Sequence, residues 1–151
     1  MNKRLLAAGL AVALGLGSSL ASAQVKPDTL VKQRQAGMVL IAKYFGPLGG
    51  MAAGRVPFDA AVVTRNAAIL DVLAKTPWDG FAPTTSGEKS AALPAVYSDG
   101  AKFKEAGDRM QTAVTALVAA SKGGNEATIK AAIGDVGKSC GACHDSFRQK
   151  Q

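Results

Sequence analysis

A helical repeat near the end of the chain is the feature that most constrains the fold. Six apolar or cysteine residues recur at intervals of four, three, four, three and four positions: Ile129, Ile133, Val136, Cys140, Cys143 and Phe147. A spacing that averages 3.5 residues is the one with which antiparallel helices interdigitate their side chains in a four-helix bundle. The repeat therefore predicts a long helix with both cysteines on its core-facing side.

Three further apolar stripes with helical spacing precede this one, and no run of strict alternation is long enough to predict a strand. The first stripe consists of Leu30, Arg34, Met38, Ile41 and Phe45. The second consists of Phe58, Val62, Arg65, Ile69 and Val72, and the third of Phe103, Gly107, Met110, Val114 and Leu117. The predicted fold class is all-α, an antiparallel up-down-up-down four-helix bundle.

The helix boundaries follow from capping residues and breakers. The first helix is expected to begin at Pro27-Asp28 and to kink or end at Gly46-Pro47, because proline lacks an amide donor. The third is expected to begin near Ser98-Asp99, and Asn125 can cap the fourth. Between the second and third helices lies a long connection, "KTPWDGFAPTTSGEKSAALP", in which the aromatic residues of "PWDGF" predict that the first half packs down.

The first 23 residues have the pattern of a cleavable secretory signal. Lys3 and Arg4 precede an apolar run from Leu5 to Leu16, and the small residues Ala21-Ser22-Ala23 precede Gln24. The alternative, a retained membrane anchor, is disfavoured because the run is shorter than the ~20 residues that a span requires. We therefore expect residues 1–23 to be removed, residues 24–151 to form one domain, and the mature protein to reside in the periplasm.

The charge of the mature chain is moderately basic. Without Lys3 and Arg4, 16 basic residues stand against 11 acidic ones, a net charge of +5. The basic residues are scattered singly and no nucleic-acid-binding motif is present, so a nucleic-acid partner is not expected. An acidic partner or an anionic membrane surface is compatible with this charge, but charge alone identifies neither.

The segment "SCGACHDSFRQ" holds both cysteines and the only histidine of the chain. A zinc site would need a second Cys/His pair, which the sequence lacks, and a redox dithiol is expected early in a βαβ unit. The remaining interpretation is that C-x-x-C-H attaches a c-type haem in an exported protein. On a helix, Cys140, Cys143 and His144 project toward one side, so two thioethers and an axial imidazole can serve one haem.

Arg148 stands four residues after His144, one helical turn further on. Its guanidinium can therefore lie beside the histidine face of the haem. The alternative is a solvated arginine that interacts favourably with the C-terminal end of the helix dipole.

The mature region resembles cytochrome c′, the class II c-type cytochromes. The segments that carry the resemblance occur in the family's order: "VKQRQ", "FDAA", "PWDGF" and "DVGKSCGACHDSFR". The C-terminal position of C-x-x-C-H is the most specific of them. The resemblance implies a four-helix bundle, usually a homodimer through its first two helices, with a five-coordinate high-spin haem whose apolar distal side binds NO or CO.

The resemblance also implies roles for individual residues. Cys140 and Cys143 match the thioether positions and His144 the axial ligand, while Arg34 and Gln35 match a pair near the haem propionates. Gln35 can equally be a surface amide. Met38 matches the position that covers the distal face of the iron. It can instead ligate the iron, as in low-spin relatives, or be an ordinary core methionine.

Two functions follow from these expectations. The first is a periplasmic c-type haem protein that binds NO or CO and undergoes one-electron redox chemistry. The second is a six-coordinate electron-transfer cytochrome with Met38 as sixth ligand. An enzyme is not expected, because the single histidine is used as a ligand and no second acid-base constellation is present. The redox partner is not specified by the sequence.

Overall fold

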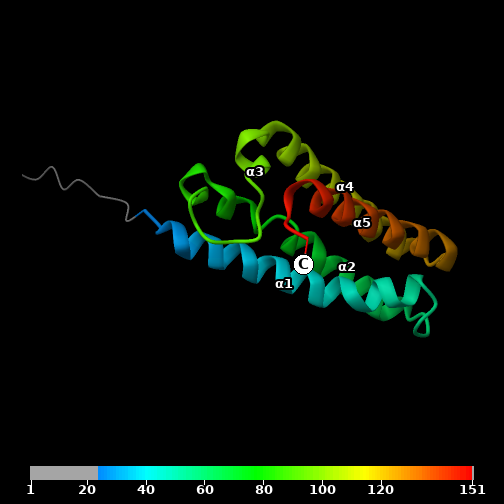
Figure 1. Cartoon of the computed structure of the whole chain (residues 1–151). Coiled ribbons are helices and arrows are strands. Elements are labelled where there is room, and N and C mark those ends of the chain that lie inside the picture. The colour runs from blue at the N-terminus through cyan, green and yellow to red at the C-terminus, as the bar shows by residue number, and fades with distance from the viewer. Residues whose placement is uncertain (1–23, 151) are drawn as a thin grey trace, which may run out of the picture.

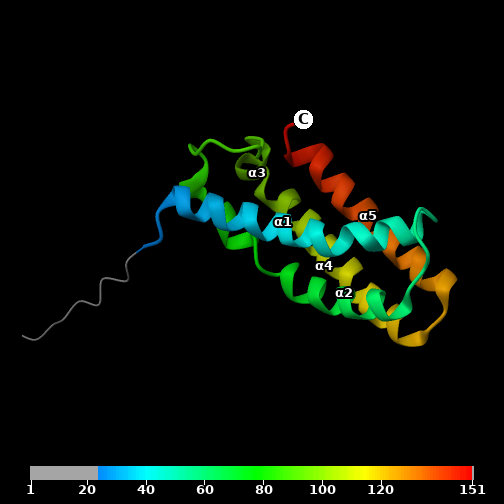
Figure 2. The ribbon, with the colours of Figure 1, turned by 90° about the horizontal axis from the view of Figure 1, so that it is seen from below.

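The computed structural model describes residues 24–150, which form an elongated bundle of four long helices (Figures 1 and 2). These are α1 (Pro27–Ala52), α2 (Ala60–Leu73), α4 (Gly100–Gly123) and α5 (Glu126–Phe147). Successive long helices run in opposite directions, and α1 and α4 each pack against both α2 and α5. The predicted all-α, up-down-up-down bundle is confirmed. The signal peptide predicted for residues 1–23 lies outside the described residues.

The helix starts agree with the capping signals of the sequence. Asn125 precedes α5, and its side-chain oxygen accepts a hydrogen bond from the amide of Thr128. Asp59 does the same before α2, for the amides of Ala61 and Val62. These bonds satisfy amides that have no partner within the helix. The predicted cap at Asn125 is therefore confirmed.

The first helix does not end at Gly46-Pro47, so that alternative of the prediction is wrong. α1 continues through Pro47 to Ala52. A proline inside a helix costs about 3 kcal/mol through the lost hydrogen bond and the clash with the preceding turn. Beyond it, however, Leu48 is fully buried and Met51 is nearly so. The burial of these two side chains, about 1.5–3 kcal/mol each, offsets that cost.

The apolar stripe predicted for the second helix is also wrong. The side of α2 that enters the core carries Val63, Asn66, Ala67 and Leu70, whereas Val72 is 65% exposed and Arg65 is exposed. The prediction took its phase from Phe58, which precedes the capping residue Asp59 and is not part of the helix. Phe58 still packs on the core, but its position does not set which face of α2 is buried.

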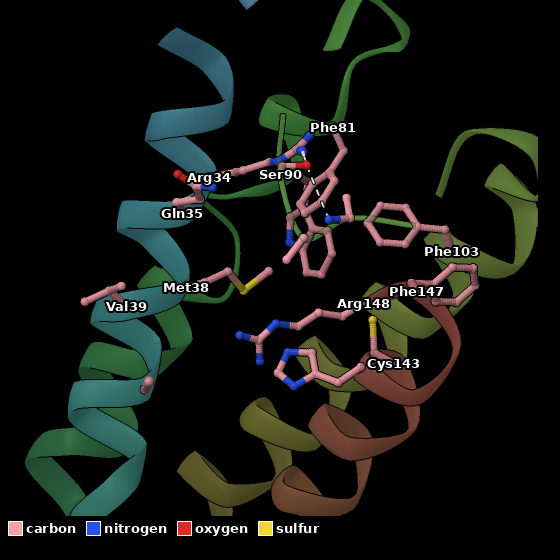
Figure 3. A pocket seen from close by; sticks show the side chains of 15 residues that line it. Arg34, Gln35, Met38, Val39, Phe81, Ser90, Phe103, Cys143, Phe147 and Arg148 are labelled. Atoms are coloured by element: carbon pink, nitrogen blue, oxygen red, sulfur yellow. Dashed lines mark hydrogen bonds between the residues drawn. The ribbon is translucent and has the colours of Figure 1, made fainter. Parts of the chain in front are cut away.

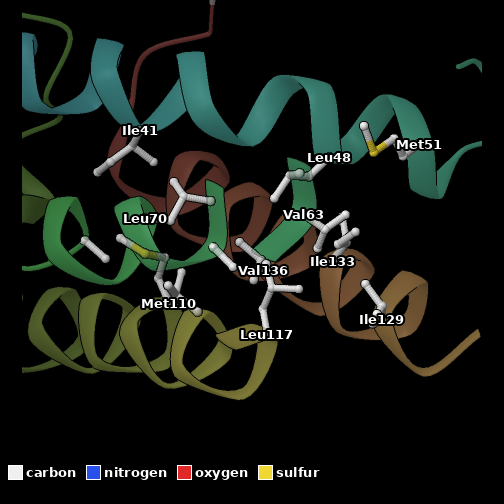
Figure 4. Packing of buried hydrophobic residues seen from close by; sticks show 13 residues of the cluster. Ile41, Leu48, Met51, Val63, Leu70, Met110, Leu117, Ile129, Ile133 and Val136 are labelled. Atoms are coloured by element: carbon white, nitrogen blue, oxygen red, sulfur yellow. The ribbon is translucent and has the colours of Figure 1, made fainter. Parts of the chain in front are cut away.

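Most of the bundle interior is one aliphatic cluster contributed by all four long helices (Figure 4). Its fully buried members include Leu48, Leu70, Leu117, Ile129 and Ile133. A second, smaller cluster lies at one end of the bundle, where Val96, Ala106 and Phe147 are buried. Its partly buried members include Phe81, Phe103 and Cys143. The fourth predicted stripe is confirmed, because it runs from Ile129 in the first cluster to Phe147 in the second.

The connection between α2 and α4 is folded onto this end of the bundle. It contains two short 3₁₀ helices, η1 (Trp78–Phe81) and η2 (Pro83–Thr85), and a short helix α3 (Ala95–Ser98). A methyl group on Gly107 would lie 2.9 Å from the Trp78 ring, and one on Gly80 would lie 2.6 Å from Cβ of Arg34. The two glycines therefore permit the connection to lie tightly against α4 and α1. The predicted packing of its first half is confirmed, and α3 was not predicted.

Candidate functional site

A cavity of about 580 Å³ opens between α1, the connection after α2, the start of α4 and the end of α5 (Figure 3). Its volume is in the usual range for ligand pockets. Most of its lining is apolar: Met38, Val39, Ala42, Trp78, Phe81, Ala91, Ala92, Phe103, Cys143 and Phe147. The polar lining consists of Arg34, Gln35, Ser90, His144 and Arg148. Six of the seven predicted site residues thus converge on one cavity.

The cysteines lie one helical turn apart on α5. Cys143 lines the cavity and packs against the second, smaller cluster, whereas Cys140 packs against the aliphatic cluster one turn earlier. Both thiols are free and half-buried. Burial raises the pKa of each thiol, and at Cys143 the nearby Cys140 raises it further while Arg109 lowers it. The thiols are therefore held largely protonated before any reaction.

His144 follows on the same face and lines the cavity beside Cys143. Partial desolvation is the main cause that lowers its pKa below the usual histidine value, and the charge of Arg148 lowers it further, against an opposing effect of Asp145. The imidazole is thereby biased toward its neutral form. A neutral imidazole has the free lone pair that a metal ligand requires.

Arg34 is 3% exposed, and its guanidinium holds the connection after α2 in place. Its Nη1 donates to the carbonyl oxygen of Gly80 at 2.7 Å, to Thr85 Oγ1 at 3.1 Å and to Tyr97 Oη at 3.1 Å. Its Nη2 donates to Ser90 Oγ at 2.8 Å. The guanidinium also lies 4.4 Å from the centroid of the Phe81 ring. Arg34 is thus at the cavity wall, as expected, with these described contacts directed at the connection.

The other predicted residues come from the two facing helices. Gln35 is exposed at the edge of the cavity, and half-buried Met38 lies one turn further along α1 on the cavity wall (Figure 3). Arg148, the residue after α5, has extended backbone and its side chain lines the same cavity. The structure therefore brings Met38 on α1 and His144 on α5 to one space.

The aromatic wall of the cavity was not recognised from the sequence. Phe103 contacts three rings, with centroid distances of 4.8 Å to Phe81, 5.9 Å to Trp78 and 5.3 Å to Phe147. Trp78 and Phe81 were expected to pack down, and the other two were assigned to helix stripes. Because the four residues come from three segments far apart in the sequence, only their three-dimensional arrangement shows that they form one wall.

The cavity meets the requirements of a covalently attached haem. It offers flat aromatic walls for an apolar macrocycle, the Cys143 thiol on its lining with the Cys140 thiol one helical turn earlier on α5, and an imidazole biased to its neutral form next to Cys143. Gln35 and Arg148 on the lining provide hydrogen-bond partners for the more hydrophilic edge of such a group, while Arg34 and Ser90, bonded to each other, keep the wall beside them in place. The residues present therefore fit haem c.

The comparisons with known proteins agree with this site. A family model described as Cytochrome C' matches residues 29–148. Cytochrome c' of Rubrivivax gelatinosus is 45% identical over 126 residues, which is 83% of this chain and 98% of that protein. Cytochrome c' of Alcaligenes xylosoxydans xylosoxydans is 40% identical, with the same coverage of both chains.

The solved structures show the same relationship. The crystal structure of the Rubrivivax gelatinosus protein has a TM-score of 0.78 and 45% identity, covering 82% of this chain and 98% of that one. A nitric oxide complex of a variant of the Alcaligenes xylosoxidans protein also has a TM-score of 0.78, with 39% identity, covering 84% of this chain and 98% of that one. The chain therefore belongs to the cytochrome c′ family, and its cofactor is haem c.

Proposed function

We propose that this chain is a periplasmic, non-enzymatic protein with a five-coordinate, high-spin haem that binds NO or CO and undergoes one-electron redox chemistry. The observation that carries the proposal is the cavity in which apolar Met38, on α1, shares one space with His144, on α5. The nitric oxide complex of the Alcaligenes xylosoxidans variant and the carbon monoxide-bound form of another variant of that protein support gas binding.

Different residues of the chain have different roles in holding the haem. Cys140 and Cys143 would hold the macrocycle through thioether bonds, and His144 would supply the imidazole that binds the iron. When bound, haem c would supply an iron that can take up a small ligand and exchange one electron. Met38 and the aromatic wall make that side of the cavity apolar and would restrict the space open to bulky ligands. Gln35 and Arg34 provide donors for the propionates.

An alternative function is electron transfer by a six-coordinate, low-spin haem with Met38 as sixth ligand. The observation that favours it is the placement of a flexible thioether on the cavity wall, where it is only half-buried. The spin state of the iron separates the two functions. The optical spectrum of the ferrous protein before and after addition of CO is the test. High-spin bands that change fully with CO support gas binding, and low-spin bands that resist CO contradict it.

We also infer that two chains associate through α1 and α2. These helices and the turn after α1 expose large apolar side chains: Val39 is 68% exposed, Leu40 41%, Val56 45% and Val72 65%. Single exposed apolar residues are normal, but a group of them on adjacent elements is typical of an interface. Val72→Lys should shift a dimer toward monomer in light scattering. A wild-type monomer at micromolar concentration contradicts the proposal.

Export to the periplasm rests on residues 1–23 and on the chemistry of haem attachment at C-x-x-C-H. None of the described helices is both long and apolar enough to cross a membrane. Mass spectrometry of protein from the periplasmic fraction tests the proposal. We expect a mature chain that begins at Gln24 and carries the added mass of one haem, and a chain that retains residues 1–23 contradicts it.

A further inference from the structure

The end of α5 is held by a short backbone pairing with the connection after α2. The amide of Leu93 donates to the carbonyl oxygen of Phe147 at 2.9 Å, and the amide of Gln149 donates to that of Ala91 at 2.8 Å. Between these bonds, Ala92 and Arg148 form an antiparallel bridge. We call residues 91–93 paired with residues 147–149 the clamp.

The clamp sets the direction in which Arg148 leaves the helix. Its backbone is extended, with φ −126° and ψ 139°, and its amide donates to the carbonyl oxygen of His144. The side chain enters the cavity (Figure 3), whose lining includes His144.

Ser90 connects the clamp to the buried arginine of α1. Its Oγ accepts one hydrogen bond from Arg34 Nη2 at 2.8 Å and another from the amide of Ala92 at 3.3 Å. Arg34 is itself fixed by three further hydrogen bonds to the connection. A continuous series of contacts therefore runs from α1 through Ser90 and Ala92 to Arg148.

We propose that Ser90 is a positioning residue: by joining Arg34 to the clamp, it holds the Arg148 guanidinium beside His144 and thereby sets the charge next to the iron. The inference rests on haem attachment at this cavity and does not depend on gas binding. Replacing the Ser90 hydroxyl leaves a buried guanidinium nitrogen and the Ala92 amide without this acceptor, which destabilises the local structure. The clamp should then open more often, and Arg148 should move away from His144.

The midpoint reduction potential of the haem-loaded protein reports where the Arg148 guanidinium lies. A positive charge near the iron favours the ferrous form, so Arg148→Gln should lower the midpoint potential at low ionic strength, where screening is weak. Ser90→Ala should lower it too. Because Ser90 acts through Arg148, the double variant should have the potential of Arg148→Gln alone.

Two controls separate positioning from general loosening. Ser90→Thr keeps the hydroxyl and should restore the wild-type potential, and Ser86→Ala changes an exposed serine of the same connection and should leave it unchanged. Hydrogen exchange measured by mass spectrometry should be faster by roughly five- to tenfold in residues 91–93 and 147–149 of Ser90→Ala only.

The inference is overturned if Ser90→Ala leaves the potential unchanged, or if the Ser90→Ala and Arg148→Gln shifts simply add. Unchanged exchange in the clamp overturns it as well. A failure to bind CO contradicts the proposed gas-binding function, yet the potentials of the five variants would still decide the role of Ser90.

Discussion

The two ends of the bundle are built differently. At the end away from the cavity, the interior is aliphatic and closed: Leu117, Ile129 and Ile133 are fully buried, and all four long helices contribute (Figure 4). At the cavity end, the walls are aromatic rings from separate segments, half-buried except for Phe147, and one buried guanidinium holds the connection that carries two of them. The first end is complete on its own, whereas the second encloses space for a cofactor.

This difference indicates that stability and the surroundings of the haem depend on different residues of the chain. Most of the buried hydrophobic side chains lie in the aliphatic cluster, and the burial of each contributes about 1.5–3 kcal/mol. The cavity end is less closely packed, because its side chains surround an open space. Substitutions at the two ends should therefore separate loss of stability from changes at the haem.

Leu117→Ala should have the largest effect on stability and none on the haem. Leu117 is fully buried in α4, and its truncation leaves a cavity in close-packed surroundings. We expect the free energy of unfolding to fall by about 3–5 kcal/mol in denaturant titrations, with an unchanged optical spectrum. Val25→Ala, at a position 47% exposed, is the control and should have little effect. A changed haem spectrum in Leu117→Ala would show that the two ends are not independent.

Arg34→Lys should affect the cavity end next most strongly. A lysine cannot span the acceptors on Gly80, Thr85, Ser90 and Tyr97 that the guanidinium joins. We expect a loss of about 2–3 kcal/mol, with faster proteolysis in residues 75–94. Arg55→Lys, at an exposed arginine after α1, is the matched control and should behave as wild type. Protection of residues 75–94 equal to that of wild type would contradict the anchoring role of Arg34.

Gly107→Ala tests the close contact between α4 and the connection. The added methyl group would lie 2.9 Å from the Trp78 ring, so the ring or the helix must shift, at a cost of about 1–3 kcal/mol. The control is Gly134→Ala in α5, where the added methyl group has no atom within 4 Å. That variant should gain about 0.5–1 kcal/mol through better helix propensity. A stabilised Gly107→Ala protein would show that Trp78 is not seated against α4.

How much of the molecule follows from its sequence differs between the two ends. The stripe from Ile129 to Phe147 predicted α5, because a helix buries one face at regular spacing, and C-x-x-C-H predicted the attachment site. Helix phase and helix length were less predictable. The phase of α2 could not be read from Phe58, and the burial of Leu48 and Met51 beyond Pro47 depends on contacts with other helices.

The cavity was predictable only in part. Local spacing placed Cys143, His144 and Arg148 together because they share one helix and its end. Resemblance, and not spacing, related Arg34, Gln35 and Met38 to them across the bundle. The role of Ser90 had no sequence signal, since it depends on a hydrogen bond to a residue 56 positions away. Long-range contacts of this kind are what a single sequence leaves undetermined.

Met38→Ala should have the smallest effect on stability and the most informative effect at the haem. Met38 is only half-buried on α1, so we expect a loss of no more than about 1–2 kcal/mol. If Met38 only covers the iron, its truncation removes crowding and no iron bond. The resting spectrum should then stay high-spin, and CO should bind faster and more tightly in stopped-flow measurements.

The control for this prediction is Met51→Ala, because Met51 is on the same helix but packs in the aliphatic core. It should lose more stability than Met38→Ala and leave the CO kinetics unchanged. Met38→Ala should do the opposite, with a small loss of stability and a large change in CO binding. The opposite result for Met38 is equally clear. A low-spin wild type that becomes high-spin in Met38→Ala would show that the sulfur ligates the iron, and the protein would then be an electron-transfer cytochrome. That outcome would leave Cys140, Cys143 and His144 in their assigned roles, because the attachment on α5 does not depend on what α1 presents to the cavity.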